Sequence, residues 1–196
     1  MAKLYFRYGA MGASKTANVI MVSYNYGERG QKAVIIKPAT DTRDEADVIR
    51  SRIGLQADVV RFGSHDDLYS MFVDGKLGKG GIDCVVVDEA QFLTAEQVRQ
   101  LSDLADRHGV PVICYGLRTD FRGELFPGSA TLMACADSIE EIKTMCWCGK
   151  KATFNARICN NTVVKEGKQV MIGGNDLYVA LCRLHWKVGM LELRKS

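Results

Sequence analysis

The chain has 196 residues, of which 47% are hydrophobic and 25% are charged, a composition that excludes a disordered chain and fits one compact domain with at most a small second lobe. Lys and Arg number 26 against 23 Asp and Glu, so the formal charge of +3 gives no strong attraction to nucleic acid or to an anionic membrane. No apolar stretch approaches the roughly 20 residues of a membrane span, and the first residues lack a signal-peptide pattern. We therefore expect a cytoplasmic protein with neither a nucleic-acid nor a membrane partner.

Apolar strands alternate with helical patterns through residue 142. Strands are expected at residues 4–6, 33–36, 59–62, 82–87 and 111–115, and helices at 15–26 and 95–108. The second helix has apolar residues at Val98, Leu101, Leu104 and Ala105, a spacing that is typical of one buried helix face. This alternation predicts an α/β fold in which helices cover both faces of a mainly parallel sheet.

The pattern changes after about residue 143. A CWCG segment is followed by a polar stretch with Asn155, Asn160 and Asn161, and then by a hairpin pattern at 163–172 that turns at 166–168. Residues 176–184 have the spacing of a short helix. We therefore divide the chain into an α/β domain at 1–142 and a small C-terminal lobe at 143–196.

Residues 9–16, GAMGASKT, lie between the first expected strand and the first expected helix. They match the phosphate-loop pattern GxxxxGK[ST], except that Ser14 replaces the second glycine. In such loops backbone N–H groups face the phosphates, Lys15 would reach the β and γ phosphates, and the Thr16 hydroxyl would bind Mg²⁺. The alternative is a helix start rich in small residues, but the flanking strand and helix favour a P-loop NTPase-like domain that binds ATP with Mg²⁺. Serine carries a Cβ where glycine tolerates positive φ, so we expect Ser14 to reduce activity.

Two carboxylates follow the apolar run that ends at residue 87. Asp88 and Glu89 would lie at the carboxyl end of that strand, where open α/β sheets bind their ligands. Asp88 fits the residue that holds the Mg²⁺ shell in P-loop enzymes, and Glu89 could accept the proton of an acceptor hydroxyl. The alternative is that Asp88 caps the following helix and Glu89 is solvated. The phosphate loop upstream favours the functional interpretation.

Seven cysteines form an odd set in a chain without an export signal, which argues against a disulfide framework. Cys146 and Cys148 with Cys182 and His185 offer three thiolates and an imidazole, the ligand number and type of a closed tetrahedral Zn²⁺ site. The alternative is a set of unrelated buried thiols. We expect a structural zinc site, because four protein ligands leave no open position for water.

Several segments, taken in order, carry a family resemblance. They are GAMGASKT at 9–16, KPATDTR at 37–43, DEAQF at 88–92, GLRTDF at 116–121, the four expected zinc ligands and IGGNDLY at 172–178. Together they resemble cytosolic thymidine kinase of the zinc-containing type, and CWCGKKAT resembles its bacterial members. The resemblance implies transfer of the ATP γ-phosphate to the 5′-hydroxyl of thymidine, giving dTMP and ADP in nucleotide salvage. It also implies a homotetramer and feedback inhibition by dTTP.

The resemblance further implies roles for individual residues. Glu89 matches the family's catalytic proton acceptor. The positions that match its ATP-contacting segments are Gly9, Ala10, Met11, Gly12, Ala13, Ser14, Lys15, Thr16, Asp41, Thr42, Arg43, Asp88, Glu89, Ala90 and Gln91. The positions that match its nucleoside-contacting segments are Phe121, Gln169, Val170, Met171, Ile172, Gly173 and Tyr178. Without the resemblance, Phe121 would be interpreted as core, Gly173 as part of a turn and Asp41 as a helix cap.

Two other functions remain open at this point. The chain could be a binding protein that senses nucleotide or binds nucleic acid without catalysis. The near-neutral charge weighs against nucleic acid, and Glu89 beside Asp88 weighs for an enzyme. A kinase for a related deoxynucleoside such as deoxyuridine is the nearest variant, because the sequence indicates the class of acceptor better than its methyl group.

Overall fold

A computed structural model describes residues 2–40, 47–78, 80–169 and 177–191. Its centre is a six-stranded sheet in the order β5-β2-β6-β7-β1-β8, and every neighbouring pair is parallel. The strands are β1 (Leu4–Tyr8), β2 (Ala33–Pro38), β5 (Val60–Phe62), β6 (Cys84–Val87), β7 (Val112–Gly116) and β8 (Ser138–Glu141). The expected α/β fold with a mainly parallel sheet is therefore confirmed.

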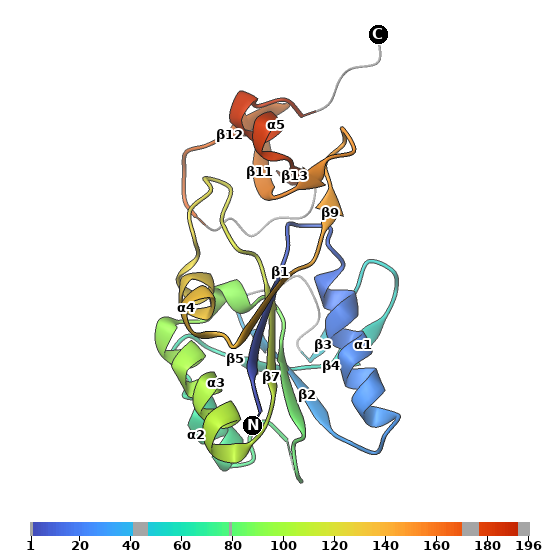
Figure 1. Cartoon of the computed structure of the whole chain (residues 1–196), viewed down its shortest axis with the longest axis vertical. Helices are drawn as coiled ribbons and strands as arrows, with labels where there is room; N and C mark the ends of the chain where they lie inside the picture. The colour runs from blue at the N-terminus through green and yellow to red at the C-terminus, as the bar shows by residue number, and fades with distance from the viewer. Residues whose placement is uncertain (1, 41–46, 79, 170–176, 192–196) are drawn as a thin grey trace.

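Helices cover both faces of this sheet, as Figure 1 shows. On one face lies α1 (Lys15–Gly27), whose Val19 and Ile20 pack with Val86 of β6. The other face carries α2 (Leu68–Val73), the short 3-10 helix η1 (Ala90–Phe92), α3 (Ala95–His108) and α4 (Pro127–Cys135). Val85 and Val87 of β6 belong to that second core, since successive strand residues point to opposite faces. Strands buried on both faces explain the continuous apolar run that the sequence shows.

The helix α3 has the bounds that the sequence predicted. Its four apolar positions lie on one helix face, at intervals of three, three and one residues, and are all buried. Thr94 and Gln97 form a reciprocal capping box at its start, which satisfies backbone N–H groups that have no helical partner. At its end Gly109 adopts a left-handed conformation with φ 67°, where glycine has no steric penalty.

The C-terminal lobe lies beyond the carboxyl ends of the sheet strands (Figure 1). It consists of the pair β9 (Thr144–Met145) and β10 (Lys151–Ala152), the sheet β12-β11-β13, and α5 (Arg183–Val188). The three sheet strands are β11 (Phe154–Cys159), β12 (Thr162–Val164) and β13 (Tyr178–Leu181). The division of the chain into an α/β domain and a lobe between residues 142 and 143 stays a prediction.

Outside the lobe, a further antiparallel pair is formed by β3 (Val48–Arg50) and β4 (Gln56–Asp58).

One expectation for the lobe is wrong and another is only partly covered. The second arm of the hairpin expected at 163–172 lies partly outside the described residues, and the hairpin that the structure does describe joins β11 to β12 around Asn160 and Asn161. Both asparagines have positive φ, 49° and 57°, as the tight turns that match strand twist require. The helix expected at 176–184 is instead β13 followed by α5, because pairing of β13 with β11 overrides the local helical spacing. No helix among the described residues has the length and apolar character needed to cross a membrane.

Candidate active site and metal cluster

The phosphate loop connects β1 to α1 at the carboxyl edge of the sheet. A Cβ on Gly9 would lie 2.5 Å from the carbonyl oxygen of Ile142, so only glycine fits there. Gly12 has φ 78° and Ser14 has φ 54°, both in the left-handed region. The serine at the variant position of the motif therefore adopts the conformation for which glycine is usually selected.

Lys15 and Thr16 connect the loop to its surroundings. The Lys15 Nζ donates to the carbonyl oxygens of Gly9 and Ala10, both at 3.0 Å, so the lysine folds back over the loop. The Thr16 hydroxyl donates to Asp88 Oδ2 at 3.0 Å. This last bond joins the phosphate loop to the carboxylate at the end of β6, the two motifs expected to hold Mg²⁺, although 72 residues separate them.

Asp88 follows β6 and is only 2% exposed. Its Oδ1 also accepts the backbone N–H of Glu89 at 3.0 Å. Burial, and then the neighbouring charge of Glu89, raise the pKa of Asp88 to about 7, against the opposing effects of Lys37 and the Thr16 hydrogen bond. Lys37, at the end of β2, is itself 1% exposed. A buried carboxylate with a raised pKa gains from a bound cation, so the site suits Mg²⁺.

Glu89 has a left-handed backbone conformation with φ 52°. Its carboxylate accepts a short hydrogen bond from Gln91 Nε2. The other amide atom of Gln91, Oε1, accepts the backbone N–H of Leu117 at 2.9 Å. A Cβ on Gly116 would lie 2.9 Å from that same oxygen. Gln91 therefore holds Glu89 against the end of β7, next to Asp88.

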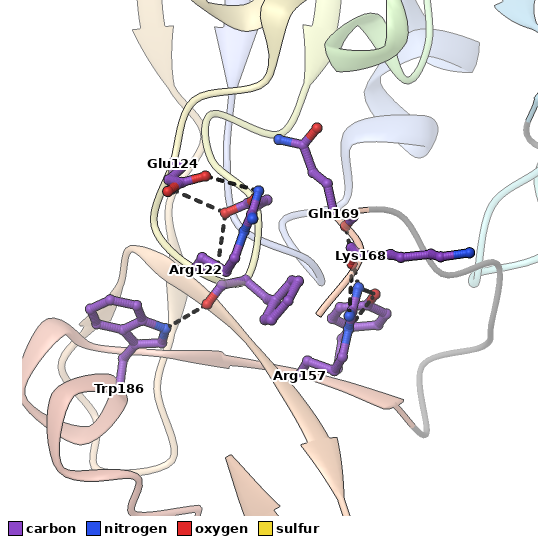
Figure 2. Close-up of polar contacts among 9 residues, drawn as sticks. Arg122, Glu124, Arg157, Lys168, Gln169 and Trp186 are labelled. Carbon is purple, nitrogen blue, oxygen red and sulfur yellow. Dashed lines mark hydrogen bonds and ion pairs between the residues drawn. The ribbon is translucent and has the colours of Figure 1, made fainter. Parts of the chain in front are cut away.

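The predicted nucleoside-contacting residues that the structure describes are Phe121, Gln169 and Tyr178. All three contact Arg157 of β11 (Figure 2), a residue that belongs to none of the motifs recognised in the sequence. The Phe121 carbonyl also accepts the indole N–H of Trp186 at 3.0 Å. The remaining predicted positions, Asp41, Thr42, Arg43, Val170, Met171, Ile172 and Gly173, lie outside the described residues.

Asn155 was also missed. Its Oδ1 accepts the backbone N–H of Met11 in the phosphate loop at 2.7 Å, and its Nδ2 donates to the Thr119 carbonyl at 3.5 Å. Asn155 and Arg157 are alternate residues of one strand, and both are buried. Polar residues at alternate positions of a strand were the available signal, but that signal can be interpreted only once the strand is known.

The four expected metal ligands converge in the lobe. Their ligand atoms, from Cys146, Cys148, Cys182 and His185, all lie within 4.8 Å of one another. The Cys146 sulfur is 3.4 Å from His185 Nδ1, and the Cys148 and Cys182 sulfurs are 4.0 Å apart. A tetrahedral zinc site with Zn–S bonds of about 2.3 Å has edges of about 3.5–3.8 Å. The donor set and its spacing therefore fit a four-coordinate zinc ion.

Two features prepare these ligands to bind a metal ion. The ring of Trp147 stacks on the His185 ring with centroids 4.3 Å apart, which fixes the imidazole plane. Cys182 precedes α5, and the backbone amide of His185 lowers the pKa of its thiol toward the thiolate that binds metal. None of the seven cysteines forms a disulfide.

Comparisons with known proteins agree with this arrangement. The family model described as thymidine kinase matches residues 2–186. A thymidine kinase of Legionella pneumophila (strain Lens) is 53% identical over 190 residues, which cover 96% of this chain and 91% of the relative. Thymidine kinases of Rhizobium meliloti and Haemophilus influenzae are each 48% identical, covering 98% and 95% of this chain and 100% and 97% of the relatives. The chain belongs to the thymidine kinase family.

Proposed function

We propose that this protein is a thymidine kinase, which transfers the γ-phosphate of ATP to the 5′-hydroxyl of thymidine and gives dTMP and ADP. Family membership supports the reaction. The observation that carries it in this chain is the hydrogen bond from Thr16 to Asp88, which joins the phosphate loop to the carboxylate rim of β6. A phosphoryl-transfer site needs both parts together, because its catalysis consists mainly of positioning and electrostatic stabilisation.

On the donor side, the backbone N–H groups of residues 9–16 would bind the phosphates of ATP. Lys15 would add a positive charge at the β and γ phosphates, and Thr16 and Asp88 would hold Mg²⁺. That ion, when bound, offsets negative charge on the phosphates during transfer. Asp41, Thr42 and Arg43 are proposed to complete the ATP contacts, with Arg43 opposing the charge of the transferred group.

On the acceptor side, Glu89 is the proposed proton acceptor. It lies next to Asp88 in sequence and is held by Gln91, so it can receive the proton of the 5′-hydroxyl as the phosphoryl group arrives. The proposed nucleoside contacts are Phe121, Gln169, the segment 170–173 and Tyr178.

The Cys146, Cys148, Cys182 and His185 cluster is proposed to bind one structural Zn²⁺. Four protein ligands complete a tetrahedron, so such an ion would take no part in phosphoryl transfer. Its role would be to stabilise the lobe that carries β11 and β13.

Assembly, regulation and location are proposed on the family resemblance. We propose a cytoplasmic homotetramer that is inhibited by dTTP and binds no nucleic acid. Met21 and Tyr24 of α1 are 51% and 65% exposed, which offers an apolar surface for a subunit contact. Analytical ultracentrifugation would measure the assembly, and dTTP added to the kinase assay would measure the inhibition.

A coupled assay of ADP release with thymidine tests the function. We expect thymidine-dependent turnover in the presence of Mg²⁺, and the same assay with deoxyuridine measures the preference for the methyl group. ATP binding without turnover on either nucleoside would instead support the nucleotide-sensing alternative.

A further inference from the structure

Arg157 lies in the middle of β11 and is 5% exposed. The strand alternates: Ala156 belongs to the core of the lobe, and Phe154 stacks on Trp186 with centroids 4.3 Å apart. Asn155 and Arg157 therefore point to the opposite side, where Asn155 contacts the phosphate loop. This orientation directs Arg157 away from the core of its own lobe.

The guanidinium of Arg157 connects three segments, as Figure 2 shows. Its Cζ lies over the Phe121 ring, 3.6 Å from the ring centroid, a distance that places the guanidinium in contact with the ring. Nε and Nη2 donate to the Tyr178 hydroxyl at 3.0 and 2.8 Å. Nη1 donates to the Lys168 carbonyl at 2.9 Å, and Nη2 donates to that of Gln169 at 3.2 Å.

These partners require an arginine and not simply a positive charge. Every hydrogen-bond acceptor of Arg157 is an uncharged oxygen, and within the described ranges no carboxylate forms an ion pair with it. Burying a cation without an anionic partner is costly, and here the cost is offset by four hydrogen bonds and a ring contact. Lysine would keep the charge but not the planar group that stacks and donates in several directions.

Phe121 is fixed from a second direction. Asp120 accepts the backbone N–H groups of Arg122 and Glu124, and its carboxylate pairs with the Arg122 guanidinium at 2.9 Å. The loop that carries Phe121 is therefore rigid by itself, while Tyr178 lies on a different strand. Arg157 contacts both, with its Cζ 3.6 Å from the centroid of the Phe121 ring and 5.4 Å from that of the Tyr178 ring.

We propose that Arg157 is a positioning residue for the acceptor nucleoside: it holds Phe121 and Tyr178 in the relative arrangement that the nucleoside requires. The inference rests on the proposed function. It also limits that function, because the face of Phe121 in contact with Arg157 is not available to a base. Any contact of Phe121 with the nucleoside uses the rest of its ring.

The test compares Arg157→Lys with the wild type in the full-length, zinc-loaded protein. We expect the KM for thymidine to rise about tenfold or more, while the KM for ATP changes by less than about twofold. Zinc content and thermal midpoint are measured in parallel. Arg183→Lys, at an exposed arginine of the same lobe, is the matched control and should match the wild type. An unchanged KM for thymidine, or an equal rise in both KM values, would overturn the inference.

Tyr178→Phe provides a second measurement that does not depend on the folding of the arginine variant. It removes the hydroxyl to which Arg157 donates twice and leaves the ring in place. We expect the KM for thymidine to rise about threefold, and in the double variant the two effects should be less than additive. Additive effects would contradict a role of Arg157 through Tyr178.

The outcomes for the proposed function and for this inference can be told apart. A wild-type protein that binds ATP without turning over thymidine would contradict both. Normal wild-type turnover with an unaffected Arg157→Lys variant would contradict only the inference.

Discussion

The α/β domain and the C-terminal lobe differ in how much apolar side chain each buries. The sheet has a cluster of 18 buried residues on one face and a cluster of nine on the other, within the described part of the chain. The lobe has a cluster of five, of which Cys146 and Cys182 are proposed metal ligands. Small units with so little core usually need a metal or disulfides to fold. The α/β domain should therefore fold without zinc, and the C-terminal lobe should not.

Cys182→Ser should produce the largest effect and tests this difference directly. Loss of one of four ligands should release zinc, and structural zinc sites supply on the order of 10 kcal/mol to the folding of small zinc domains. We expect thymidine turnover to be lost, while hydrogen exchange in β1, β6 and β7 stays slow. Cys159→Ser is the matched control, because Cys159 is exposed and outside the cluster. A variant that retains turnover without zinc would refute the dependence of the lobe on the metal.

Glu89→Gln should be nearly as severe for turnover but should leave both regions folded. The substitution removes the proposed proton acceptor and keeps the shape of the side chain, so kcat should fall roughly 100- to 10,000-fold. ATP affinity, measured by isothermal titration calorimetry, should stay close to that of the wild type. Turnover that survives the substitution would exclude Glu89 as the base and would make Asp88 the next candidate.

The sequence predicted the α/β domain better than the lobe, and the reason is physical. The spacing of Val98, Leu101 and Leu104 and the pattern of the phosphate loop are local, so they can be read without the fold. Asn155 contacts Met11, which is 144 residues away in the sequence, and no local pattern predicts a contact between such distant residues. In the lobe, strand pairing also overrides local propensity, which is why β13 was mistaken for part of a helix.

Asp88→Asn should change stability in a pH-dependent way. Burial raises the pKa of Asp88 to about 7 in the folded protein, so the folded state binds more protons than the unfolded state between about pH 4 and pH 7. The free energy of unfolding contributed by this group therefore falls as pH rises through that window. Without added Mg²⁺, we expect the variant to be more stable than the wild type by about 2 kcal/mol at pH 8 and by less at pH 4.5.

Urea unfolding at both pH values measures the difference in free energy of unfolding between the variant and the wild type. Asp58→Asn, at an exposed carboxylate on β4, is the control. A difference that does not depend on pH would contradict the proposed burial effect.

Ser14→Gly should have the smallest effect, and it concerns the one departure of the donor side from its motif. Ser14 has φ 54°, a conformation that costs a residue with a Cβ about 1 kcal/mol or more and costs glycine nothing. The serine side chain makes no capping hydrogen bond at the start of α1, so its removal costs the helix no cap. Against this gain stands the greater freedom of glycine in the unfolded chain, about 0.5–1 kcal/mol. ATP affinity depends on the loop and not on the unfolded chain, so we expect it to stay equal or to rise by less than about fivefold.

Ser14→Ala separates the contribution of the hydroxyl from that of the Cβ, because it removes the hydroxyl and keeps the Cβ. If both variants bind ATP clearly more weakly than the wild type, the hydroxyl contributes to binding and the serine is an adapted part of this loop. If Ser14→Ala matches the wild type and Ser14→Gly binds ATP more weakly, the Cβ is accommodated without strain.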